Sequence, residues 1–244
     1  MGFIGFVFDP LPFLFYRNIP FMTGSLSAKE DLVKYGISAK NITIVPHGVI
    51  LPKRKYLKVV SKNKIKTVVF LGTLSKDKGI EDALKCFVIL SKKGKYNFWV
   101  IGKSENKNYY DQLRRLVKRL KLNGKVKFWG YVDQKKKFDL LSKSHILINP
   151  SIHEGWGLVN IEANYLGTPV VAYKSAGLVD SVKNGLSGVI VRKNNHKDLA
   201  EAVISILDDN NAYSRLQRGA INWSKKFNWR ESRKKSLKLI NSIA

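Results

Sequence analysis

Cysteine and histidine are scarce in this sequence, and their scarcity limits the chemistry that the protein can perform. The single cysteine, Cys86, excludes an internal disulfide and any cysteine-based metal cluster. It stands within an expected helix, and we interpret it as a packing residue rather than a nucleophile. The four histidines, His47, His145, His153 and His196, include no pair at ligand spacing on one helix face. We therefore expect no metal site and no metal cofactor.

Acidic residues are also few. The chain has 44 lysines and arginines against 18 aspartates and glutamates, which gives a formal net charge of +26. Such a surface attracts polyanions, either nucleic acids or anionic lipid headgroups. No RRM, zinc-finger or basic-zipper pattern is present, so nucleic acid is not the partner that we expect. The lysines are spread along the chain, with denser clusters at 53–66, 135–137 and 225–238. This leaves two interpretations, an ordinary solvated surface or peripheral contact with an anionic membrane.

The sequence offers no good membrane-spanning or signal segment. Its most apolar stretch, residues 1–16, has no positive residue before it, as a signal peptide would have. Asp9, Pro10, Pro12 and Arg17 interrupt it within the ~20 residues that a membrane span needs. We interpret this stretch as part of a buried element, and the alternative is a segment at a membrane interface. We accordingly expect a cytoplasmic protein, with contact at the inner face of the membrane as the peripheral option.

Short apolar runs recur through the rest of the chain and predict a parallel sheet. They are residues 67–71, 98–101, 126–129, 146–148, 170–172 and 188–191. Segments with helical spacing lie between them, so the pattern implies an α/β fold with about six parallel strands and helices on both faces. In such a sheet ligands bind beyond the carboxyl ends of the strands. Gly72, Gly102 and Gly130 all stand at those ends.

The stretch from Asn149 to Gly167 is the most informative part of the chain. It follows the apolar run 146–148, crosses a turn rich in proline and glycine, and continues as a helix from roughly Gly157 to Leu166. Gly167 and Pro169 are typical of a helix end. A strand, a glycine loop and a helix start in series make an anion site, because free N–H groups and the helix dipole face the ligand.

Two glycines and two carboxylates stand in this stretch. Gly155 and Gly157 carry no Cβ, so we expect them to let a ligand approach the backbone closely. Glu154 lies in the turn, and Glu162 lies within the helix. Solvated glutamates and glycines that only turn the chain are the alternative interpretation.

This stretch resembles the signature of the retaining GT-B glycosyltransferases, called group 1 or family four. The resemblance rests on Pro150-Ser151-x-x-Glu154-Gly155-x-Gly157-Leu158, then Glu162-Ala163, then Gly167-x-Pro169-Val170-Val171. It implies a Rossmann-like domain in which Glu154 lies against the donor sugar and Glu162 binds the ribose hydroxyls of the sugar nucleotide. It also implies that a run of backbone N–H groups holds the diphosphate, at Gly155, Trp156, Gly157 and Leu158.

Two further loops are similar to the same family. The run Gly72-Thr73-Leu74-Ser75-Lys76-Asp77-Lys78-Gly79 is similar to the loop in which an arginine and a lysine clamp the donor diphosphate. Lys78 matches the lysine, although it is also readable as one more surface lysine. Thr73 stands where the family has arginine, which replaces a bidentate phosphate donor with a hydroxyl, and Lys76 is the residue that would compensate.

The other loop is Gly130-Tyr131-Val132, similar to the family's Gly-x-Val loop, whose backbone faces the nucleobase. The run Ala176-Gly177-Leu178-Val179-Asp180 is only an approximate match to the Gly-Gly-x-x-Glu of the family.

The resemblance also divides the chain. Residues 1–50 correspond to a remnant of the N-terminal acceptor domain and its hinge, with Ser27-Ala28-Lys29-Glu30 as the capping box of a helix that ends at Gly36. Residues 51–66 are expected to be a linker, and residues 67–244 the donor-nucleotide-binding domain with C-terminal helices. Because residues 1–50 are too few for a second Rossmann-like domain, three alternatives stay open. The chain is a fragment, or a separate polypeptide carries the N-terminal GT-B domain, or the domain has another use.

The resemblance implies a hexosyltransferase-type enzyme that moves a sugar from a nucleotide diphosphate to a glycan or lipid-linked acceptor, with retention at the anomeric carbon. Lys78 and the helix start would stabilise charge on the leaving diphosphate without a metal, and Glu154 would orient the sugar. A catalytically inactive nucleotide-sugar-binding module that acts through a partner is the second hypothesis, which Thr73 favours. A basic nucleic-acid binder is the third, and its affinity would fall steeply with salt.

Overall fold

The computed structural model describes residues 13, 15–52 and 61–243 of the 244-residue chain. The chain divides into two compact units, residues 51–226 and residues 1–50 with 227–244. The expectation of a buried or interfacial apolar element at residues 1–16 falls largely outside the described residues, as does most of the lysine cluster at 53–66. No helix in the described part of the chain is long and apolar enough to cross a membrane.

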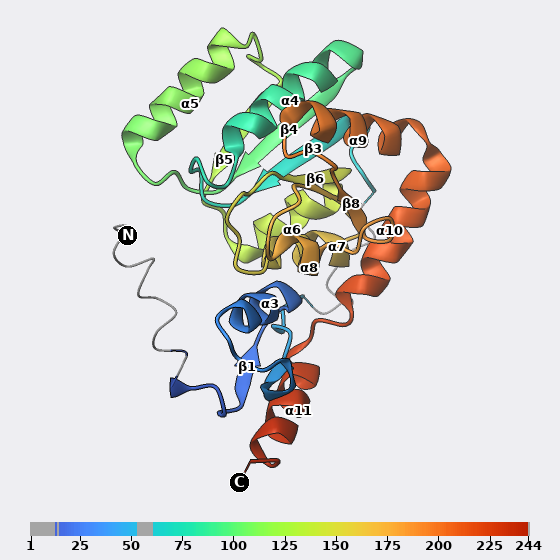
Figure 1. Cartoon of the computed structure of the whole chain (residues 1–244). Helices are drawn as coiled ribbons and strands as arrows, with labels where there is room; N and C mark the ends of the chain where they lie inside the picture. The colour runs from blue at the N-terminus through green and yellow to red at the C-terminus, as the bar shows by residue number, and fades with distance from the viewer. Residues whose placement is uncertain (1–12, 14, 53–60, 244) are drawn as a thin grey trace. The chain divides into compact units, whose positions relative to one another are not determined.

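The unit of residues 51–226 contains a six-stranded parallel sheet, and this confirms the predicted α/β fold class (Figure 1). Its strands are β3 (Lys66–Leu71), β4 (Tyr96–Ile101), β5 (Val126–Gly130), β6 (Ile146–Asn149), β7 (Val170–Ala172) and β8 (Gly188–Ile190). Each predicted apolar run forms one of these strands. Their side chains are mostly buried because both faces of the sheet are covered.

Seven helices of this unit lie within the described residues. They are α4 (Ile80–Lys93), α5 (Lys107–Arg119), α6 (Gln134–Lys143), α7 (Leu158–Tyr165), α8 (Leu178–Ser181), α9 (His196–Asp208) and α10 (Asn210–Ser224). Helices α4 and α9 contact each other on one face of the sheet, and α6 and α7 contact each other on the other face (Figure 1). Cys86 of α4 is fully buried, and this burial raises the pKa of its thiol, which fits a packing role.

The strand order, β5-β4-β3-β6-β7-β8, reverses direction in the middle of the sheet. The chain proceeds outward from β3 to β4 and β5, then returns to β6 on the other side of β3 and proceeds outward to β8. The loops after β3 and β6 therefore start from neighbouring strands but lead to helices on opposite faces. This reversal is the point where open parallel sheets bind ligands.

The other unit holds a small parallel pair of strands. Its elements are β1 (Phe21–Thr23), α3 (Leu26–Lys34), η1 (Ala39–Asn41), β2 (Ile42–Ile44) and α11 (Trp229–Ile240). The Ser232 hydroxyl of α11 donates a hydrogen bond of 2.6 Å to the carbonyl of Pro46. The predicted capping box at Ser27 is wrong, because the helix has already begun at Leu26. Ser25 is the cap, and its side-chain oxygen accepts from the Ala28 N–H at 3.1 Å.

Lys62 departs from the expectation of solvated lysines. Its ammonium donates to the Ser144 carbonyl at 2.6 Å and to the Thr168 hydroxyl oxygen at 2.7 Å. The Thr168 hydroxyl itself donates to the Leu141 carbonyl at 2.7 Å. Burial at this position lowers the pKa of Lys62 to about 7, because a desolvated ammonium is disfavoured.

Lys62→Met should flatten the pH dependence of stability above neutrality. The native amine loses its proton near pH 7, whereas the unfolded lysine keeps it up to its ordinary pKa of 10.5. The unfolded state therefore binds one more proton in this window, so wild-type stability rises with pH and is lost as the pH falls toward 7. His145 does not contribute there, because burial and then the charges of Lys62 and Lys66 lower its pKa to about 4.

The measurement is urea unfolding of wild type and variant across the window from about pH 7 to about pH 9. Lys64→Met, at an exposed lysine of the same segment, is the matched control and should keep the wild-type slope. Equal slopes for wild type and Lys62→Met would contradict the assignment.

Candidate functional site

The loops after β3 and β6 are joined by their backbones. The Ile152 N–H donates to the Asp77 carbonyl at 2.9 Å. A Cβ on Gly79 would lie 2.2 Å from the Pro150 oxygen, and the φ of Gly79 is +71°, so only glycine fits between the loops. The two loops that the sequence predicted to form one site are thus in direct contact.

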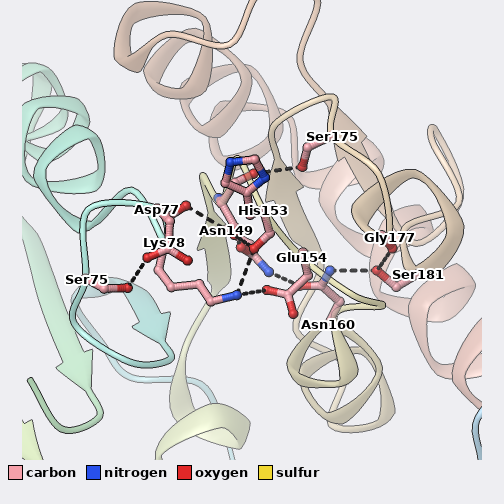
Figure 2. A network of polar contacts seen from close by, with 11 residues as sticks. Ser75, Asp77, Lys78, Asn149, His153, Glu154, Asn160, Ser175, Gly177 and Ser181 are labelled. Atoms are coloured by element: carbon pink, nitrogen blue, oxygen red, sulfur yellow. Dashed lines mark hydrogen bonds and ion pairs between the residues drawn. The ribbon is translucent and has the colours of Figure 1, made fainter. Parts of the chain in front are cut away.

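Lys78 and Glu154 face each other across this junction, as Figure 2 shows. The Lys78 Nζ lies 3.1 Å from Glu154 Oε2 and donates to the His153 carbonyl at 2.8 Å. Their side chains are 26% and 21% exposed, so the pair is accessible to a ligand. The ammonium can donate to a phosphate, and the carboxylate beside it can accept from a sugar hydroxyl, within one small space. The structure therefore brings both predicted catalytic residues together, and their roles stay predictions.

The rest of the loop after β3 is held by a local turn. The Ser75 hydroxyl donates to Asp77, and this bond, followed by the charge of Lys78, lowers the pKa of that carboxyl. Asp77 is therefore an anion that fixes the turn. Thr73 and Lys76 are both exposed in the same loop.

The loop after β6 ends at the start of α7, with Gly157 in a left-handed conformation (φ 80°, ψ 50°). We expected Gly157 to let a ligand approach the backbone. The structure shows a different reason for glycine at this position, namely that a Cβ would collide with neighbouring side chains. A Cβ there would lie 2.7 Å from Ser181 Oγ and 2.8 Å from Asn160 Nδ2. Gly155 differs, because no atom lies within 4 Å of where its Cβ would stand. Open backbone for a ligand is therefore found at Gly155.

The two large side chains of the same loop differ in exposure. Trp156 is 5% exposed, so its ring is buried. Leu158, the first residue of α7, is 45% exposed.

A buried chain of polar side chains supports this loop, and the sequence analysis missed it. The Asn149 amide donates to Asn160 Oδ1, the Asn160 amide donates to Ser181 Oγ, and Ser181 Oγ donates to the Gly177 carbonyl, each at 2.9 Å (Figure 2). Buried polar groups need such partners, so the chain fixes α7 relative to β6 and α8. The only signal in the sequence is that an asparagine ends an apolar strand.

Gly177 also touches the loop directly. Its φ is +75°, and a Cβ there would lie 2.3 Å from the Glu154 carbonyl oxygen. The start of α8 is therefore packed against the backbone of the residue that carries one of the two predicted carboxylates.

Glu162 lies inside α7 and is only 9% exposed. Its Oε1 accepts from the Lys137 ammonium at 2.6 Å. Its Oε2 is buried and has no hydrogen-bond partner among the described residues. A carboxylate can only accept hydrogen bonds, so this oxygen lacks a donor. Lys137 was missed as a site residue because the run 135–137 appeared in the sequence only as a charge cluster.

The loop after β5 begins at Gly130 (φ 66°). Tyr131 is 83% exposed, and Val132 packs against the hydrophobic core. Asp133 then caps α6 by accepting from the Lys136 N–H at 2.7 Å. The loop reaches the others through backbone bonds, Gly102 N–H to the Gly130 carbonyl at 2.9 Å and Gly72 N–H to the Ile101 carbonyl at 3.1 Å.

Acidic and histidine side chains in the described part of the chain do not gather into a metal centre. Among the residues that the structure describes, no group of three or more His, Cys, Asp or Glu residues is placed to hold a metal ion. The polar groups of the site are instead the ammonium, carboxylate and backbone N–H groups described above.

Residues 53–223 match the family model described as Glycosyl transferases group 1. An uncharacterized glycosyltransferase of Methanocaldococcus jannaschii is 29% identical over 230 residues, which cover 90% of this chain and 57% of the relative. The capsular polysaccharide biosynthesis glycosyltransferase CapM of Staphylococcus aureus is 33% identical over 159 residues, covering 64% of this chain and 40% of the relative. The chain thus spans about half the length of the curated relatives it matches.

Among solved structures, that of Anabaena HepE in complex with UDP-glucose has a TM-score of 0.77 to this chain. The match covers 93% of this chain and 65% of HepE, at 16% sequence identity. At this identity the likeness shows a shared fold.

Proposed function

Because this chain belongs to the group 1 glycosyl transferases, we propose that its six-stranded unit is the donor-binding half of a retaining GT-B enzyme. The donor is a nucleotide-diphosphate sugar. The candidate site lies where the strand order reverses, which is where such sheets bind nucleotides. HepE, which shares the fold, has been solved with UDP-glucose, and this supports a uridine nucleotide as the first donor to test.

The observation that carries this proposal is the unpartnered oxygen of Glu162. A buried carboxylate oxygen without a donor is costly, and a ligand hydroxyl would remove that cost. The ribose of a nucleotide offers two neighbouring hydroxyl donors. We assign Glu162 to the ribose, and the loop of Gly130, Tyr131 and Val132 to the nucleobase.

The diphosphate is assigned to the loops after β3 and β6. Lys78 supplies positive charge, and N–H groups supply hydrogen bonds at Gly155, Trp156, Gly157, Leu158 and, in the facing loop, Thr73. The Gly72 N–H is already bonded to the Ile101 carbonyl, so Gly72 is assigned to the donor only through its backbone without a Cβ. During transfer the bond from the anomeric carbon to the diphosphate breaks, and the diphosphate takes the electron pair. The acceptor oxygen forms the new bond and gives its proton to an oxygen of the leaving diphosphate. Lys78 and the start of α7 stabilise the charge on the leaving group, and Glu154 orients the sugar.

This arrangement needs no metal in our proposal, since Lys78 and the helix start face the diphosphate. The acceptor is a glycan or a lipid-linked sugar. The likeness to a capsular polysaccharide enzyme supports the first, and the net charge of +26 supports peripheral contact with an anionic membrane from the cytoplasm. Because the relatives are about twice as long as the matched part, an N-terminal acceptor domain is proposed as the partner of this half.

Calorimetric titration tests the donor site. UDP, GDP and ADP, with their glucose or mannose derivatives, are added to the chain without metal and then with Mg²⁺. We expect saturable binding of one base without metal. Lys78→Ala should weaken that binding by about 10- to 100-fold, since a hydrogen bond between charged groups contributes ~1.5–3 kcal/mol.

The matched control is Lys92→Ala, an exposed lysine in the last turn of α4, which should bind like wild type. The nucleoside of the base that binds, without phosphates, should bind both lysine variants and wild type equally. Absence of binding by any nucleotide, with or without Mg²⁺, would refute the proposed function.

An inactive binding module is the second candidate, and Thr73 favours it. Arginine at this position would bind phosphate through two parallel hydrogen bonds, whereas threonine offers one hydroxyl. Thr73→Arg should therefore raise the affinity for a nucleoside diphosphate. Sugar release from the donor, measured with and without the N-terminal half of a relative, separates the two functions. Binding without any turnover in either assay favours the inactive module.

A further inference from the structure

The ion pair between Lys137 and Glu162 joins the two parts of the site that face the nucleoside. Lys137 lies in the first half of α6, the helix that follows the loop of Gly130, Tyr131 and Val132. Glu162 lies in α7, which packs against α6. The distance from Lys137 Nζ to Glu162 Oε1 is 2.6 Å, and the side chains are 21% and 11% exposed.

The pair uses only one oxygen of the carboxylate. Oε1 accepts from the lysine, while Oε2 is buried without a donor in the described part of the chain. A carboxylate that is free to rotate about its terminal bond would exchange the two oxygens. An ammonium held at one of them fixes the plane of the group and leaves the same oxygen unsatisfied in every molecule.

The position of the lysine is itself restrained. Its ammonium lies 5.1 Å from the centre of the Phe138 ring, and Phe138 is buried in the core. Asp133 caps the start of the helix that carries both residues. The Lys137 side chain therefore reaches Glu162 in a restrained position on α6, unlike a freely rotating surface lysine.

We propose that Lys137 is a positioning residue that aims Glu162 Oε2 at the 2′-hydroxyl of the ribose and so makes the donor site selective for ribonucleotides over 2′-deoxyribonucleotides. This inference rests on the proposed function and deepens it. A ribose hydroxyl that binds an acceptor already oriented and desolvated contributes more binding free energy than a hydroxyl whose acceptor must first be ordered. A nucleotide without that hydroxyl leaves Oε2 unpaired, which is how buried polar groups reject an analogue that lacks the matching group.

The experiment measures the ratio of dissociation constants for matched ribo- and deoxyribonucleotides. UDP, GDP and ADP are titrated against their 2′-deoxy counterparts by calorimetry, and the base that binds is used throughout. We expect wild type to prefer the ribonucleotide by about tenfold or more, as one hydrogen bond to a charged group allows. Lys137→Met should reduce the preference to less than about threefold, and Lys137→Arg should restore most of it.

Two further variants keep the test specific. Lys135→Met removes an exposed lysine from the same helix and should keep the wild-type ratio. Lys137→Gln serves as a second replacement, and thermal unfolding of each variant shows that it is folded.

A purely structural ion pair predicts a different result. Loss of Lys137 would then lower the melting temperature, or weaken both nucleotides equally, with the ratio unchanged, and that outcome overturns the inference. Wild-type binding with no ribose preference overturns it as well while leaving the proposed function intact. Failure of wild type to bind any nucleoside diphosphate overturns both.

Discussion

Glu162→Ala should weaken the binding of a nucleoside diphosphate by about 10- to 100-fold, because hydrogen bonds to a charged group contribute ~1.5–3 kcal/mol. The effect is large because the carboxylate is 9% exposed and one of its oxygens has no partner in the described part of the chain. A bound ribose therefore replaces no protein contact at that oxygen. Calorimetry with the full chain gives the dissociation constant directly.

Glu201→Ala is the control for the loss of one negative charge, since Glu201 is an exposed glutamate of α9. Removing either glutamate makes the chain more basic by the same amount, so general attraction to the diphosphate rises equally in both. Glu162→Gln should give an intermediate loss, since the amide keeps an oxygen acceptor but not the charge. Unchanged affinity in Glu162→Ala would remove Glu162 from the site.

Gly177→Ala should lower the free energy of unfolding by about 2–5 kcal/mol. The backbone at φ +75° disfavours a Cβ by ~1–2 kcal/mol, and forcing atoms into a packed site adds ~1–3 kcal/mol. The new methyl would lie 2.3 Å from the Glu154 carbonyl oxygen, so the loop after β6 has to move. We expect a melting temperature lower by roughly 4–20 °C, because 1 kcal/mol corresponds to ~2–4 °C in a chain of this size.

Gly185→Ala separates strain from contact. Gly185 has the same φ of +75°, but no atom lies within 4 Å of its missing Cβ. Its replacement should therefore have only the backbone penalty of ~1–2 kcal/mol. Nucleotide affinity should fall in folded Gly177→Ala and not in Gly185→Ala. If the two variants have the same melting temperature and the same nucleotide affinity, Gly177 does not support the loop after β6.

The sheet was predictable from sequence because its strands are short apolar runs, and β3, β4 and β5 also end at or just before a glycine. The strand at Val170–Ala172, for example, has the bounds that its residues predicted. Strand β1 was not predicted, because Phe21–Thr23 is only three residues long and partly exposed, so it shows no apolar run. The capping serine was misplaced because Ser25 and Ser27 are both good caps, and only the backbone path decides between them.

The candidate site was predictable where its residues are close in sequence or carry a recognisable spacing. Such patterns named Lys78, Glu154 and Glu162, whose roles in the site stay predictions. Lys137 was not predictable, because among so many lysines a single ion pair across helices leaves no local pattern. The reason for glycine at position 157 was also hidden, since it depends on Ser181, a neighbour that only the folded chain brings near.

The backbone bond between Ile152 and Asp77 has a consequence for how this site could change over generations. Main-chain atoms and Gly79 set the distance between the loops after β3 and β6. Most exposed side chains of these loops can therefore change without altering that distance. A substitution such as threonine for arginine at position 73 changes the hydrogen-bond donors that face a ligand, while the backbone of the two loops stays in place. New donor preferences could therefore arise here by single replacements, without a refolding of the loops. The glycines at the junction are the positions where such exchange would be rejected.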